Sequence, residues 1–246
     1  MLLNGSSKGT DPTEWKKEGT HMSKNSLIPK KRAALVVDTL KELYPDAECS
    51  LESGGDPWRL LVMGRLSAQC TDARVNIVCR ELFLKYPDCN AMADAEISEL
   101  EEAVKPCGLY KTKAASLKAA SAMVRDEFGG RIPDTMEELL RLPGIGRKIA
   151  NLLLGDIYKK GGIVADTHCI RICGRLGFYP EEKKDPILTE RVMEKLIPAS
   201  EQSDFCHRIV HFGRETCTAR APRCGDCPLR TACKHAEKQK RSTKSE

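Results

Sequence analysis

The 246-residue sequence predicts an all-α protein with short connections between its helices. Apolar residues recur at the three- and four-residue spacing of a helix face in nearly every segment. No segment keeps the alternating polar and apolar pattern of a half-buried β-strand. Several of the apolar faces follow a typical helix N-cap residue and a proline at the first helical position, as in the pairs Asp56-Pro57 and Asp185-Pro186.

In the first half of the chain, each predicted helix lies between a start signal and a stop signal. Pro45 ends the first helix, Asp56 and Pro57 begin the second, and two glycines at 129–130 end the longest. Asp94 is expected to cap a further helix. The predicted helices cover residues 30–44, 58–70, a segment restarting at 71–72, a segment after 94, and 111–128.

The second half continues the same pattern. Pro133 opens a short helix with two glutamates in its first turn, where acidic side chains complement the helix dipole. The predicted helices cover residues 133–142, 147–154, 166–176, 185–197 and 204–214. The charged segment 234–246 is expected to be frayed.

The ends and the overall composition limit the possible classes of protein. Residues 1–22 show no apolar periodicity and end in Gly-Thr-His-Met, which is typical of an expression leader. The formal charge of +5 permits nucleic-acid binding without requiring it. No stretch approaches the roughly 20 apolar residues of a membrane span. No secretory signal leads the chain, so its thiols are expected to be reduced.

The stretch LPGIGRK at 142–148 combines a tight turn with a lysine at the edge of an apolar helix. Gly144 and Gly146 allow close backbone approach, and the free amides that begin the next helix form a seat for an anion. Lys148 flanks the apolar side, where partial loss of hydration favours a nucleophilic amine. The pattern indicates chemistry on a nucleic-acid backbone. The simpler alternative is a common turn followed by a lysine that extends into solvent.

The last four of the 12 cysteines have the spacing of metal ligands. Cys217, Cys224, Cys227 and Cys233 fall within 17 residues that contain few apolar side chains. Because such a loop cannot bury a core, four thiolates around a metal centre would organise it. The spacing leaves both zinc and an iron–sulfur cluster open, since each accepts four thiolates. The other cysteines are typical of small core residues.

Three features stand in a fixed order: the hairpin at 142–148, the segment VADTH at 164–168, and the four-cysteine loop. The segments LSAQCTD at 66–72 and CGLYKTKA at 107–114 precede them. Over roughly residues 28–236 this pattern closely resembles endonuclease III, a bifunctional DNA glycosylase with AP-lyase activity. The hairpin alone occurs in many DNA-binding proteins. The combination of Lys148, Asp166 and the cysteine spacing is highly specific.

The resemblance implies a role for each matching residue. Lys148 would attack C1′ of a damaged nucleotide and form a Schiff base, and Asp166 would stabilise the cationic sugar. The four cysteines would ligate a [4Fe–4S] cluster rather than zinc. The implied DNA contacts are Gln69 and Leu109, which fill the gap left by a flipped base, the hairpin residues Gly144, Gly146 and Arg147, and His168.

The resemblance also implies a fold with a DNA cleft between two helical lobes. Residues 51–160 would form a six-helix barrel domain that contains the helix-hairpin-helix, and 23–50 together with 161–246 would form the cluster domain. The implied enzyme is a monomer of the bacterial cytoplasm, at the nucleoid. It would remove oxidised pyrimidines from double-stranded DNA and cut 3′ to the abasic site by β-elimination.

Simpler explanations and competing functions remain at this stage. Asp166 could act only as a helix cap, Gln69 could only pack, and His168 could be a core residue. Lys148 disfavours a monofunctional mismatch or alkyl-base glycosylase. Lys148 and Asp166 together disfavour a non-catalytic iron–sulfur DNA-binding module. Arg65 is expected to lie near the pocket, where its bulk and charge would narrow the choice of base.

Overall fold

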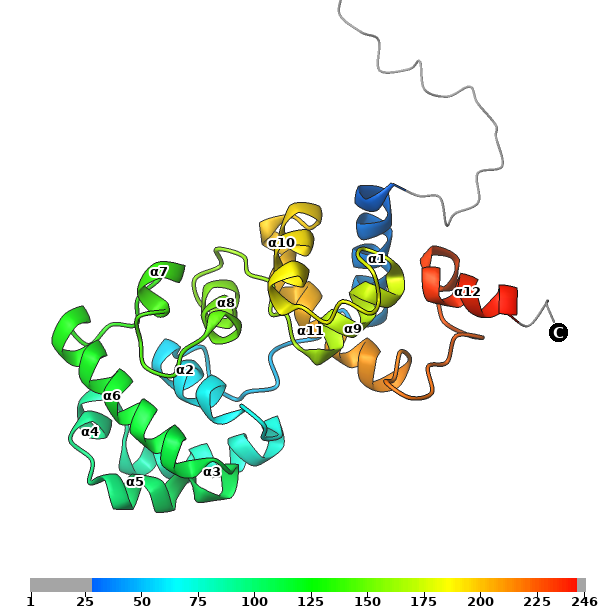
Figure 1. Ribbon diagram of the computed structural model, residues 1–246. Helices are drawn as coiled ribbons and strands as arrows, with labels where there is room; N and C mark the ends of the chain where they lie inside the picture. The colour runs from blue at the N-terminus through cyan, green and yellow to red at the C-terminus, as the bar shows by residue number, and fades with distance from the viewer. Residues whose placement is uncertain (1–27, 243–246) are drawn as a thin grey trace, which may run out of the picture.

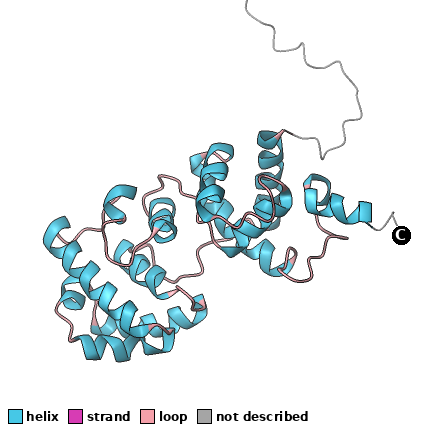
Figure 2. Cartoon of the chain, viewed as in Figure 1, coloured by secondary structure: helices cyan, strands magenta, loops and turns pink. Residues whose placement is uncertain are grey.

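The computed structural model describes residues 28–242, and every regular element within this range is helical (Figure 2). The predicted all-α class is therefore confirmed for the described part of the chain. The predicted leader at 1–22 lies outside the described residues. None of the helices in the described range is both long enough and apolar enough to cross a membrane.

Twelve α-helices and two 3₁₀ turns follow one another along residues 28–242. The first lobe of the molecule contains α2 (Pro57–Leu66), α3 (Asp72–Lys85), α4 (Cys89–Ala93), α5 (Ile97–Val104), η2 (Lys105–Cys107), α6 (Tyr110–Phe128), α7 (Met136–Leu139) and α8 (Arg147–Asp156). The second lobe contains α1 (Pro29–Leu43), α9 (Thr167–Leu176), α10 (Pro186–Leu196), α11 (Ala199–Glu215), η3 (Arg230–Ala232) and α12 (Lys234–Ser242).

The two lobes have separate hydrophobic cores (Figure 1). One core gathers buried side chains from residues 51–154. The other combines buried residues of α1, at 36–40, with residues 163–236. The chain therefore crosses between lobes at two places, the α1–α2 loop and the segment between α8 and α9.

The predicted start signals act as helix caps. The side chain of Asp56 accepts a hydrogen bond from the amide of Arg59, and Asp185 accepts from Ile187 and Leu188. Each bond satisfies a backbone donor that the helix itself leaves unpaired.

Three predicted boundaries were wrong. α2 ends at Leu66, because Gln69 adopts a left-handed backbone with φ of 56°. Asp94 does not cap α5; it ends α4, a short helix that the sequence analysis missed. α11 begins at Ala199 rather than at 204.

The charged C-terminal segment also differs from its prediction. Residues 234–242 form α12 instead of a frayed end. Ala236 is buried in the second core, so this helix is held by packing that its own charged composition does not reveal.

Candidate functional site

A pocket of about 110 Å³ lies where the two lobes meet. Its walls come from the α1–α2 loop, the start of α8, the segment before α9 and one face of α11. Lys148 and Asp166, which are 18 positions apart in the sequence, both line this pocket. The structure thus brings together the two residues predicted to be catalytic.

Lys148 is the second residue of α8, and its side chain is exposed. The predicted loss of hydration is therefore wrong for the free protein. The apolar face of α8 does pack into the first core through Ala150 and Leu153, but the first turn faces the pocket. Desolvation of the Lys148 amine would need a ligand that closes over the pocket.

Asp166 is half-buried and caps α9. Its Oδ1 accepts a hydrogen bond from the amide of Cys169 at 2.7 Å. The capping role considered from the sequence is therefore confirmed, and it fixes the carboxylate at the pocket wall. The same side chain is available to interact with positive charge inside the pocket.

Gly144 is required by the hairpin turn itself. Its φ is 78°, and a Cβ there would lie 2.6 Å from Arg65 Nε and 2.7 Å from Ser116 Cβ. Arg65 lies under this turn, where its Nε donates to Ser116 Oγ at 2.8 Å. Arg65 is not among the residues that line the pocket. Its expected effect on the choice of base stays a prediction.

Gly146 differs from Gly144, because nothing in the protein requires a glycine there. It is the N-cap residue of α8, its φ of −106° suits any residue, and an added Cβ would meet no atom within 4 Å. An open approach to the free amides of a helix start suits an anion such as a phosphate.

Gly146→Val is expected to fold normally and to weaken binding of every duplex, damaged or intact, by about tenfold or more. A loss of this size corresponds to the free energy of one hydrogen bond to a charged group. All duplexes should be affected alike, because phosphate contacts carry no sequence information. Fluorescence anisotropy on intact and lesion-bearing duplexes would measure the loss. Gly144→Ala is the matched control for a purely structural glycine, and it should lower the melting temperature instead. Unchanged affinity in Gly146→Val would remove the hairpin from the DNA interface.

Arg147 pairs with a buried carboxylate of the other lobe. Its Nε lies 3.0 Å from each oxygen of Glu190, whose side chain is only 5% exposed, and its Nη2 also bonds to Glu190. The hydrogen bonds that Arg147 donates to Glu190 raise the pKa of Arg147. This pair joins the start of α8 to α10, so it positions the hairpin. The predicted phosphate contact of Arg147 stays a prediction.

Gln69 and Leu109 share an uncommon backbone conformation. They are two of the three non-glycine residues with positive φ in the described range, at 56° and 48°. Both side chains are exposed, and the leucine is 56% exposed although it is apolar. Strained residues of this kind persist where the surrounding structure holds them and concentrate at functional sites.

A buried lysine that the sequence analysis missed holds both of these loops. Lys113 on α6 is fully buried, and its Nζ donates to the carbonyl of Leu66 at 2.7 Å and to that of Cys107 at 2.8 Å. These carbonyls lie shortly before Gln69 and Leu109 respectively. The signal that could have found it is its position directly before Ala114 in the segment CGLYKTKA at 107–114.

His168 packs inside the second lobe. Its Nδ1 accepts a hydrogen bond from Arg171 at 3.2 Å, and the ring lies against Gly213 of α11. Burial lowers the pKa of His168, so a charged contact with phosphate is disfavoured. It does not line the pocket, and its DNA role stays a prediction.

The four C-terminal cysteines line a single cavity at the end of the second lobe. The buried Arg175 borders this cavity and donates to Cys217 Sγ at 3.4 Å and to the carbonyl of Thr218 at 2.7 Å. The four thiols therefore share one cavity, as ligands of a common metal centre must.

Comparisons with known proteins match most of this chain to one family. Residues 62–199 match the model of the HhH-GPD superfamily base excision DNA repair proteins. Endonuclease III of Synechocystis is 43% identical over 209 residues, which cover 85% of this chain and 94% of that protein. Endonuclease III of Bacillus subtilis is 37% identical over 210 residues, with the same coverage of both chains.

Solved structures agree with these sequence relatives. A non-covalent endonuclease III–DNA complex superimposes with a TM-score of 0.81 at 36% identity, covering 87% of this chain and all of that one. A trapped covalent endonuclease III–DNA intermediate gives the same values.

Proposed function

This chain belongs to the endonuclease III family of base-excision DNA glycosylase/AP lyases, and we propose that Lys148 and Asp166 carry its chemistry in the pocket between the lobes. The observation that carries the proposal is their shared pocket. Each residue stands at the start of a different helix, and the two helices come from different lobes.

Lys148 supplies the nucleophile. Its Nζ attacks C1′ of the damaged nucleotide, the C1′–base bond breaks, and the base leaves with the bonding electrons. The attached nitrogen loses one of its two protons, and the C1′–O4′ bond then opens as O4′ takes up a proton, which gives a protonated imine between Nζ and C1′. The imine makes the C2′ proton acidic, so its removal expels the 3′ phosphate by β-elimination. Duplex DNA that covers the pocket desolvates the exposed amine and so favours its neutral form.

Asp166 stabilises the positive charge that develops on the sugar as the base leaves. A carboxylate at that position acts like the stabilising carboxylate in glycoside hydrolysis. Its hydrogen bond to the amide of Cys169 holds it in place, so little reorganisation is needed during the reaction.

The substrate is a damaged base in double-stranded DNA, and oxidised pyrimidines are the class that the family resemblance implies. Such a base must leave the stack to reach the pocket. Gln69 and Leu109 then fill the gap, because both are exposed and their loops are fixed by Lys113. The enzyme acts as a monomer on DNA in the bacterial cytoplasm, with residues 51–160 as the barrel domain and 23–50 with 161–246 as the cluster domain.

The four cysteines hold a [4Fe–4S] cluster that organises the loop after α11. Cys217, Cys224, Cys227 and Cys233 would be its ligands, and a set of four thiols around one cavity fits such a group. Bound there, the cluster supplies covalent connections in a segment with little apolar content. Arg175 donates to Cys217 Sγ and to the backbone of the loop, which orients the first ligand.

Borohydride trapping on a set of duplexes tests the proposed substrate class and pathway. The wild type should give a covalent adduct and 3′-side cleavage on duplexes with an oxidised pyrimidine and on an abasic duplex. An undamaged duplex of the same sequence should give neither product. Base release without an adduct or strand cleavage would instead favour a monofunctional glycosylase.

Leu109→Gly is expected to lower excision from a lesion-bearing duplex more than cleavage at an already open abasic site. Glycine adopts positive φ without strain, so the fold should be kept or slightly stabilised while the plug is lost. Gln69→Ala should show the same preference. Single-turnover rates on the two substrates measure the effect. Equal losses on both substrates would mean that these residues only shape their loops.

A further inference from the structure

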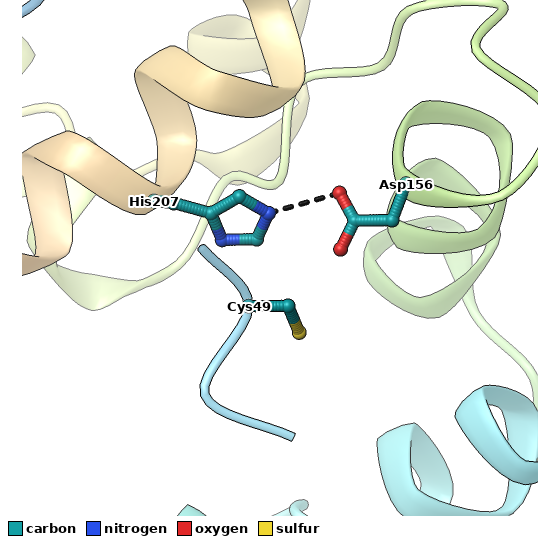
Figure 3. A group of neighbouring side chains, drawn as sticks. All are labelled: Cys49, Asp156 and His207. Carbon is teal, nitrogen blue, oxygen red and sulfur yellow. Dashed lines mark hydrogen bonds and ion pairs between the residues drawn. The ribbon is translucent and has the colours of Figure 1, made fainter. Parts of the chain in front are cut away.

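Three side chains of metal-ligand type meet beside the pocket, separate from the proposed catalytic pair. Cys49 comes from the α1–α2 loop, Asp156 is the last residue of α8, and His207 lies in the middle of α11 (Figure 3). One ligand atom from each lies within 4.8 Å of the other two. Cys49 and His207 also line the pocket, so the group is reached from solvent.

The hydrogen bonds of the group leave one carboxylate oxygen unpaired. His207 Nε2 lies 2.9 Å from Asp156 Oδ1, and Ser203 Oγ donates to the same oxygen. The other oxygen, Asp156 Oδ2, is buried and has no hydrogen-bond partner of normal geometry among the described residues. A buried acceptor left unpaired is costly. A cation bound at Oδ2 would remove that cost.

We propose that Cys49, Asp156 and His207 bind one Zn²⁺ ion. A thiolate, an imidazole and a carboxylate are all zinc ligands, and three protein ligands with a water in the fourth position are common for zinc. Thiolate ligation disfavours Mg²⁺ and Ca²⁺. In tetrahedral zinc the ligand atoms lie about 3.3–3.8 Å apart. His207 Nε2 and Asp156 Oδ1 are 2.9 Å apart, and the Cys49 sulfur lies within 4.8 Å of the ligand atoms of both residues. Side-chain shifts of no more than about 1.5 Å would therefore complete a tetrahedral set.

The ion would join three segments that meet at the pocket: the α1–α2 loop, the end of α8 in the first lobe and α11 in the second. It would therefore hold the two lobes together beside the pocket. An ion that binds only the folded protein raises its stability. Ser203 would act as a positioning residue, because it orients the Asp156 carboxylate.

Cobalt titration of the full-length, cluster-loaded protein tests the proposal. Co²⁺ bound at the site should give tetrahedral d–d bands and a thiolate charge-transfer band in difference spectra, at one equivalent, and Zn²⁺ should displace it. Added Zn²⁺ should also raise the melting temperature. Cys49→Ser should lose the charge-transfer band and should bind Co²⁺ at least about tenfold more weakly than the wild type does. Ser203→Ala should weaken binding by about tenfold, as expected for a residue that orients a ligand.

Cys70→Ser is the matched control, since Cys70 is also partly exposed but lies outside the group. It should bind cobalt as the wild type does. His207→Gln provides a second variant if Cys49→Ser does not fold, and iron content with circular dichroism checks each protein. Identical cobalt spectra in the wild type and both site variants would overturn the proposal, as would no uptake by the wild type. The three side chains would then be a hydrogen-bonded brace between the lobes.

Discussion

Lys148→Ala is expected to abolish the covalent adduct with DNA that borohydride traps, while duplex binding and the melting temperature stay close to those of the wild type. The physical reason is that no imine forms at C1′ without the Lys148 amine. Lys148 is exposed and makes no packing contribution to the core, so its truncation should not disturb α8. Denaturing gels after borohydride treatment of an abasic duplex measure the adduct.

Lys195→Ala is a suitable control, because Lys195 is an exposed helical lysine on α10 that does not line the pocket. It should trap normally. A full adduct in Lys148→Ala would mean that another amine is the nucleophile and that the central assignment is wrong.

Asp166→Asn separates the two functions of Asp166 in the same assays. Asparagine caps helices about as well as aspartate, so α9 should remain intact. The loss of negative charge should slow base release by about 10²-fold or more, the range seen when an electrostatic group of this kind is removed. An excision rate equal to that of the wild type would leave Asp166 as a structural cap only.

The second large effect is expected at the four-cysteine loop. Cys224→Ser should lose most of the bound iron and the yellow-brown colour, and the melting temperature of the second lobe should fall. The loop after α11 has few apolar side chains, so its metal ligands contribute directly to its folding free energy. Leu229 and Ala232, which lie between Cys227 and Cys233, are buried in or beside the second core and would lose their support.

Iron and zinc analysis, visible absorption and thermal melting measure this effect, and none of them depends on enzyme activity. Cys70→Ser is again the control and should keep its iron. Wild-type protein with one zinc and no iron would contradict the cluster assignment.

Sequence signals that act over a few residues predicted much of the fold. Asp56, Asp166 and Asp185 cap helices as expected, because a cap needs only a side-chain oxygen and the amides two or three residues later. The glycines of the hairpin predicted a tight turn, which also depends only on the backbone conformation of a few neighbouring residues. The helix α12 was not predicted, because it is held by a distant contact, the packing of Ala236 in the second core.

The sequence by itself determined the helical class, the family, the candidate lysine and carboxylate, and the four cysteines that were predicted to share a metal centre. The tertiary structure decided that Lys148 is exposed, that Arg147 is held by Glu190, and that Lys113 supports the loops of both plug residues. It also brought Cys49, Asp156 and His207 together. Local signals depend on backbone geometry over a few residues and can be recognised in the sequence. These other contacts join segments more than 40 positions apart in most cases. They exist only once distant helices have packed, within the first lobe for Lys113 and between the lobes for Arg147 and for Asp156 with His207.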